Sequence, residues 1–375
     1  MKRLFGVLCS LLLIFVLCPR TLAADYSTLP EEYVALESYI PEGLAQLLPD
    51  GLFSSDPQSV SEALSQLTSF AGLLELILDV SRLHLADSGL LLSSVCALLI
   101  LCALMKVLGE TWGMGGMAGL APRICLFCAV AGAGYAVVAD MVTFMSQLRV
   151  LMGGMLPMMS ALYVLGGNVS RASVGNAALG VWLNVCEQVC ARAAPPLFGV
   201  CLALRLPQVF DAPIDLSRLG DSLKKGYTTL LGVLAFVLTL CLSAQNLIAG
   251  RADSVAMRSG RYALGQMIPV VGGALSGSLD TLAAGVGLLR GVSGISGIFL
   301  LLLLCLPMLA KVLILRAVFD ATGSMAHVLG CATESALLSE AAGLLGYMAA
   351  AVAMCTAVFI IALGAFAACA AAFAV

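Results

Sequence analysis

The chain has 375 residues, of which 61% are hydrophobic and only 11% are charged, with a formal net charge of -3 at pH 7. Its mean hydropathy of +1.04 excludes a protein whose whole surface faces water, and its charge offers no basic platform for nucleic acid. Several apolar windows exceed the roughly 18 residues that a bilayer crossing requires. We therefore predict an all-α fold, a polytopic membrane helix bundle that uses the lipid bilayer as its solvent.

Residues 1–24 have the pattern of a secretory signal peptide. Lys2 and Arg3 give a positive start, residues 4–17 are apolar, and small residues around Ala23 and Ala24 offer a cleavage site. The alternative is an uncleaved first membrane helix.

Residues 25–88 are predicted to be a small, helical, acidic segment on the exported side. Between Asp25 and Asp87 there are eleven acidic residues and one basic residue, Arg82, so little positive charge holds this stretch in the cytoplasm. From Asp56 onward, apolar residues recur at steps of three and four, which predicts an amphipathic helix. Its apolar face either packs on the protein's own membrane part or docks a partner helix or the membrane surface.

Residues 89–375 are predicted to form the transmembrane domain, with six full spans and two broken or re-entrant elements. Eight full spans are the alternative. The two less regular elements are Leu151 to Gly167 and Gly265 to Gly291. The predicted full spans are Gly89 to Leu108, Ile124 to Met145, Ala177 to Leu204, Thr228 to Ile248, Val292 to Leu315 and Tyr347 to Phe373.

The two irregular elements are rich in residues that disfavour a straight helix. The first contains Pro157, and the second contains seven glycines together with Pro269. Irregular backbone is tolerated at membrane depth where protein or water satisfies its peptide groups, so these elements are pathway candidates. Close helix packing through small residues such as Gly272 and Gly273 explains the same composition equally well.

Charges within the apolar region are the next candidates for a site, because each is costly in a membrane unless it is paired or hydrated. We expect them to face inward, and Glu187, Arg192 and Asp280 are the stronger functional candidates. Structural ion pairing or snorkelling at helix ends is the alternative, especially for Lys106, Lys311 and Arg316. The charges considered within or beside the predicted elements are Asp140, Glu187, Arg192, Asp280, Arg290 and Lys311.

The basic loops set only part of the orientation. With an exported N-terminal segment, the loop that holds Lys106, Glu110 and Arg123 is cytoplasmic. Basic residues then occur on both sides of the predicted span at Thr228 to Ile248, so the side of the C-terminus stays open.

Signatures of catalysis, cofactors and metals are missing from the sequence. Its two histidines are too few for a metal cluster, and no Gly-Lys-Ser/Thr phosphate loop occurs. Cys125 and Cys128 have the spacing of a redox or metal pair, but no second pair accompanies them. We predict no catalytic residues, no metal and no cofactor, and therefore not an enzyme.

The order of parts resembles the stage III sporulation protein AE family. The resemblance lies in the stretch from Gln266 to Gly273, with Pro269, Gly272 and Gly273, and in the Asp280-Thr281 pair that follows. It implies a subunit of an apparatus linking mother cell and forespore, located in the mother-cell-derived membrane around the forespore. The partners that it implies are other membrane subunits, a cytoplasmic secretion-type ATPase and a ring-forming subunit.

Two functions are therefore considered. The first is a structural and conductive subunit of an intercellular channel that supports forespore development. The second is a secondary transporter or permease for a small solute that works alone, motivated by the broken elements and the membrane charges.

Overall fold

The computed structural model describes residues 70–112, 119–165, 168–209, 216, 218–237, 239–240 and 272–367. Only the backbone is described at 70–87, 110, 112, 170–171, 176, 186–187, 208–209, 272–292 and 295. The predicted signal peptide and most of the exported segment lie outside the described residues. All regular structure in the described part is helical, as predicted. A helix at 218–237 follows α9 in sequence. The other helices are α5 (Phe70–Trp112), α6 (Leu120–Leu165), α7 (Val169–Cys186), the π-helix η3 (Glu187–Arg192), α8 (Ala194–Ala203), α9 (Leu206–Val209), α11 (Gly272–Val328) and α12 (Ala332–Ala367).

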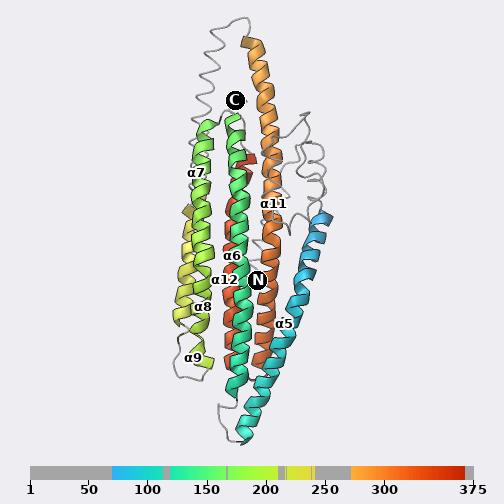
Figure 1. Cartoon of the computed structure of the whole chain (residues 1–375), viewed down its shortest axis with the longest axis vertical. Coiled ribbons are helices and arrows are strands. Elements are labelled where there is room, and N and C mark those ends of the chain that lie inside the picture. Colours follow the sequence, from blue (N-terminus) through green and yellow to red (C-terminus); the bar gives the residue numbers. More distant parts are fainter. Residues whose placement is uncertain are drawn as a thin grey trace.

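The long helices run side by side along the long axis of the molecule (Figure 1). Four segments of the described part are long and apolar enough to cross a membrane: Ser88–Gly109, Leu120–Leu165, Ser296–Val328 and Ala332–Ala367. They overlap four of the six predicted spans. The helix α6 has 46 residues, which is about 69 Å at 1.5 Å per residue, whereas the apolar layer of a bilayer is about 30 Å thick. Helices of this length extend beyond the membrane on at least one side.

An antiparallel hairpin of α11 and α12 forms the centre of the bundle. The turn between them is a Schellman motif, in which the backbone N–H of Cys331 donates to the carbonyl of Ala326 and that of Gly330 to His327, at 2.9 and 3.1 Å. Gly330 has φ of 76°, a left-handed conformation that glycine adopts without strain. The turn therefore sends α12 back along α11.

Two glycines just before the middle of α11, Gly294 and Gly297, allow close helix contact. A side chain on Gly294 would have its Cβ 2.6 Å from the Cβ of Ala367 and 3.2 Å from its Cα. A side chain on Gly297 would collide with Met155 of α6. For these two glycines, close packing is the role that the structure supports.

The structure differs from the sequence interpretation at the first irregular element and describes only part of the second. Instead of a separate broken element after residue 150, α6 continues through Pro157 to Leu165, because buried methionines on both sides of the proline, such as Met155 and Met158, hold the helix against its neighbours. Likewise, α11 is continuous from Gly272 onward, while residues 265–271 lie outside the described part.

A helix break does occur, but in the predicted span at Ala177 to Leu204. There the π-helix η3 and a turn at Ala193 separate α7 from α8, and Pro195 and Pro196 then open α8. The buried Cys190 of η3 faces Cys355 of α12 with 3.3 Å between the sulfur atoms. Because π-helices are rare and cluster at functional sites, this break is a more specific feature than the glycines.

Candidate functional site: interhelical charge clusters

The residues singled out from the sequence are distributed over several helices. Pro157 lies on α6 with an exposed side chain, and Arg192 ends η3, also exposed. The side chain of Glu187 is outside the described residues. Asp280 is in the first turns of α11, and the start of this helix extends past the end of α6 in Figure 1. No described contact joins two of these candidates.

For the family-like residues, the structure gives a backbone position only. The helix α11 includes Gly272, Gly273, Asp280, Thr281 and Arg290, whose side-chain surroundings lie outside the described part, and Pro269 is itself outside it. Their roles as pathway or packing residues stay predictions.

The structure instead brings together a buried charge cluster around Glu340, which we call the basal cluster. Its members are Glu340 of α12, Arg205 in the turn between α8 and α9, and Lys224 and Asp221 on the helix at 218–237. One carboxylate oxygen of Glu340 accepts from Lys224 Nζ and the other from Arg205 Nη2, each at 2.6 Å. The side chains of Glu340 and Lys224 are only 6% and 7% exposed. The cluster therefore joins α12 to two elements that precede it in sequence, the turn after α8 and the helix at 218–237, by charge-assisted hydrogen bonds.

Asp221 completes the cluster on its exposed side. It lies 2.7 Å from Lys224 Nζ, and 54% of its side chain is exposed. The hydrogen bond and charge of Lys224 lower the pKa of Asp221. Burial acts to lower the pKa of Lys224, but the hydrogen bonds to Asp221 and Glu340 outweigh it, so that pKa is raised. Two cations and two carboxylates thus hold one another in charged form.

Two further contacts bind the same end of the bundle to the α11–α12 turn. Arg123 of α6 lies 2.9 Å from Glu334 of α12, and both side chains are largely buried. Lys106 of α5 donates from Nζ to the backbone carbonyl of Gly330 at 2.9 Å. Polar contacts at this end therefore reach α12 or its turn from α5, from α6 and from the segment that holds Arg205 and Lys224.

A second charge site lies deeper along the helices, and we call it the membrane pair. Lys311 Nζ of α11 donates to Asp140 Oδ2 of α6 at 2.5 Å. Asp140 is 17 residues after Arg123, and Lys311 is 17 residues before Val328, about 26 Å along each helix. Both residues belong to segments apolar enough to cross a membrane. Their side chains are nevertheless 42% and 39% exposed.

The membrane pair bears on two expectations from the sequence, the orientation of Asp140 and the role of Lys311. Asp140 was expected to face inward, yet it sits on the outer surface of the described bundle. For Lys311, structural ion pairing is the alternative that the structure supports. The sequence could not pair these residues, because the partners are 171 positions apart and only the helix packing brings them together.

Sequence reasoning did not single out Glu340. It precedes the predicted span at Tyr347 to Phe373 and was assigned to no predicted element. A usable signal exists: apolar residues begin at Leu337 and Leu338, so α12 starts well before the predicted span and includes Glu340 in its buried face.

The arrangement can hold helices and charges in place, but offers little reactive chemistry. Among the described residues, no group of three or more His, Cys, Asp or Glu side chains could hold a metal ion. The basal cluster is compensated by its own charges, whereas the membrane pair presents a dipole on an apolar surface. That surface requires either water or another protein in front of it, because lipid chains cannot satisfy it.

Comparisons with known proteins agree with the resemblance noted in the sequence. The family model described as stage III sporulation protein AE matches residues 58–370. Among curated proteins, stage III sporulation protein AE of Bacillus subtilis (strain 168) is 23% identical over 179 residues, which are 47% of this chain and 44% of that protein. The match thus spans less than half the length of this relative. No solved structure matches the chain.

Proposed function

Because the chain belongs to the stage III sporulation protein AE family, we propose that it is a membrane subunit of a sporulation-specific channel complex between mother cell and forespore, and not an enzyme. The four apolar helices and the family together make it a membrane protein. The proposed location is the mother-cell-derived membrane around the forespore, with the N-terminal segment on the exported side. The proposed partners are other membrane subunits of the channel, a cytoplasmic secretion-type ATPase and a ring-forming subunit.

The membrane pair is the observation that carries a role as a subunit. A protein that works alone in lipid should bury its membrane charges within its own bundle, since each unpaired or lipid-facing charge costs several kcal/mol. Here Asp140 and Lys311 satisfy each other but remain about two fifths exposed. A neighbouring subunit, or water enclosed between subunits, would complete their solvation.

The outer helix α5 supports the same proposal. Only 17% of the residues in the apolar 18-residue stretch of Ser88–Gly109 are buried, against 67% in the corresponding stretch of Ala332–Ala367. Large side chains such as Leu90, Leu104 and Val107 are 72%, 55% and 60% exposed. This helix therefore presents a broad apolar face to the membrane or to other subunits.

The test is to purify the tagged full chain from sporulating cells and identify what accompanies it. We expect the ATPase and the ring-forming protein to co-purify with the wild type. Replacing the membrane pair by apolar residues, Asp140→Leu with Lys311→Leu, should leave the amount of folded chain unchanged but abolish co-purification and arrest forespore development. An unchanged complex in this variant contradicts the proposal that the pair faces a partner.

A secondary transporter that works alone is the second candidate, favoured by the π-helix break between α7 and α8. Its test is the purified chain reconstituted in liposomes with a panel of ions and small metabolites. Gradient-coupled uptake that disappears on Asp280→Asn or Glu187→Gln would establish the transporter and overturn the proposed role as a subunit without activity of its own. The absence of uptake from the wild type counts against the transporter.

A further inference from the structure

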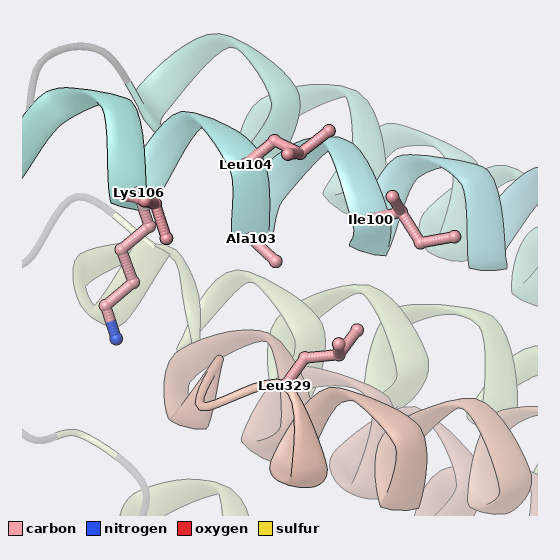
Figure 2. A pocket seen from close by; sticks show the side chains of 6 residues that line it. Ile100, Ala103, Leu104, Lys106 and Leu329 are labelled. Atoms are coloured by element: carbon pink, nitrogen blue, oxygen red, sulfur yellow. The ribbon is translucent and has the colours of Figure 1, made fainter.

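A groove lies between α5 and the turn that follows α11 (Figure 2). It has a volume of about 520 Å³, and its walls are apolar except for Lys106. The α5 side chains Ile100, Leu104 and Val107 follow the spacing of one helix face. Leu329 forms the opposite wall. The groove is thus an apolar surface depression beside the outer helix α5, with one cation, Lys106, near the end of that helix.

The position of Lys106 along α5 sets the depth of this cation. The apolar segment of α5 ends at Gly109, three residues after Lys106, so the ammonium lies where a membrane helix meets the headgroup layer. Ile100 is six residues earlier on the same helix, about 9 Å closer to the membrane interior. A molecule with an anionic head at Lys106 and an apolar tail along Leu104 and Ile100 would match both the charge and the depth.

The ammonium of Lys106 has N–H donors left to bind such an anionic headgroup. It donates one hydrogen bond, to the carbonyl of Gly330 at 2.9 Å, and an ammonium has three N–H donors. The bond to Gly330 positions the amine without neutralising it. Within the described part of the chain, no carboxylate forms an ion pair with this lysine.

The surrounding charges favour an anion at this end. Lys106 on α5 and Arg123 on α6 lie on either side of the connection that the sequence predicts to be cytoplasmic. The carboxylate nearest to Arg123, Glu334, is buried in its own ion pair. Basic pockets between membrane helices at the cytoplasmic side are suited to anionic lipid headgroups.

From these observations we propose that the groove between α5 and the α11–α12 turn is a binding site for an anionic phospholipid, with the phosphate on Lys106 and an acyl chain along Leu104 and Ile100. The lipid would fill the space between α5 and the central hairpin and hold the outermost helix in place. This inference does not depend on the proposed channel, since a transporter could use the same lipid.

The test measures lipid retention by native mass spectrometry on the full chain in mild detergent, with added dioleoyl phosphatidylglycerol or dioleoyl phosphatidylcholine. The wild type should retain phosphatidylglycerol in preference to phosphatidylcholine. Lys106→Gln should reduce that preference about fivefold, the worth of one lysine near an anionic lipid surface, while retention of the neutral lipid stays unchanged. Leu104→Trp, which fills the groove, should reduce retention of both lipids.

Lys225→Gln is the matched control, because it removes an exposed lysine at the same end but outside the groove, and it should retain lipid as the wild type does. Thermal unfolding of each variant checks that it is folded, and Ile100→Trp replaces Leu104→Trp if the latter is not. Equal retention of the two lipids by the wild type, or unchanged retention in both Lys106→Gln and Leu104→Trp, overturns the proposal. The proposal is also overturned if the wild type is a dimer that becomes a monomer on Leu104→Trp while lipid retention stays unchanged. A second copy of the chain would then occupy the groove.

Discussion

The basal cluster and the membrane pair both join α12 or α11 to other helices by charge, but they differ in what surrounds them. Glu340 is almost fully buried and shared by two cations of its own chain. The membrane pair has one charge of each sign, and about two fifths of each side chain is exposed at a depth where the helices are apolar. The first site is complete within one chain, and the second is not.

This difference assigns the two sites different roles, the basal cluster in folding and the membrane pair in assembly with partners. A buried carboxylate with two cations contributes to stability only while all its partners are present, because removing one leaves a desolvated charge behind. A half-exposed pair in an apolar surface is satisfied locally, yet still interacts with whatever covers it. We therefore expect mutations at the buried members of the basal cluster to destabilise the protein strongly, and mutations at the membrane pair to affect its partners.

Glu340→Ala should have the largest effect on the free energy of unfolding. It removes the carboxylate shared by Lys224 and Arg205 in a buried site, a change worth about 3–5 kcal/mol. Thermal or denaturant unfolding in detergent measures it. Ser339→Ala is the matched control, since Ser339 is the exposed neighbour on the same helix and should change little. A Glu340→Ala protein as stable as the control would show that helix packing alone fixes α12.

The membrane pair should give an intermediate effect with a distinctive pattern. Asp140→Leu alone leaves the Lys311 ammonium on an apolar surface and should lower the free energy of unfolding by about 1–2 kcal/mol, between the values for exposed and buried pairs. The double change Asp140→Leu with Lys311→Leu should recover most of that loss, because apolar replacement of a whole pair is close to neutral. A double variant less stable than either single one would show that the pair is a folding element like the basal cluster.

Features of the fold and of the charge sites could be predicted from the sequence where they depend on neighbouring residues, and not where they join residues far apart in the chain. The all-α membrane fold followed from composition and apolar run length, which are local properties. The pairing of Asp140 with Lys311 and of Glu340 with Arg205 joins residues 171 and 135 positions apart, and no periodicity encodes which helices touch.

The helix breaks were misplaced for a related reason. Pro157 predicts a break from local chemistry, but α6 continues through it, with buried methionines on either side packed against neighbouring helices. The π-helix η3 has no composition that distinguishes it from an α-helix. Close packing was one of two interpretations of the glycines at 265–291, and for them it stays a prediction. At Gly294 and Gly297, which the sequence analysis did not single out, the close approach of Ala367 and Met155 shows close packing.

Asp221→Asn should have the smallest effect and locates the boundary of the basal cluster. Asp221 bonds Lys224 but is more than half exposed, so water screens the pair and its loss at neutral pH should be below about 1 kcal/mol. The pKa of Asp221 is lowered in the folded chain, so its contribution is present above its ordinary value of 3.8 and is lost as the pH falls through the lower, folded value. Unfolding measured against pH should therefore show the wild type and Asp221→Asn converging in acid. If Asp221→Asn instead destabilises as strongly as Glu340→Ala, the exposed carboxylate is as important for stability as the buried one. Exposure then does not distinguish a folding site from an assembly site, and the contrast between the basal cluster and the membrane pair no longer holds.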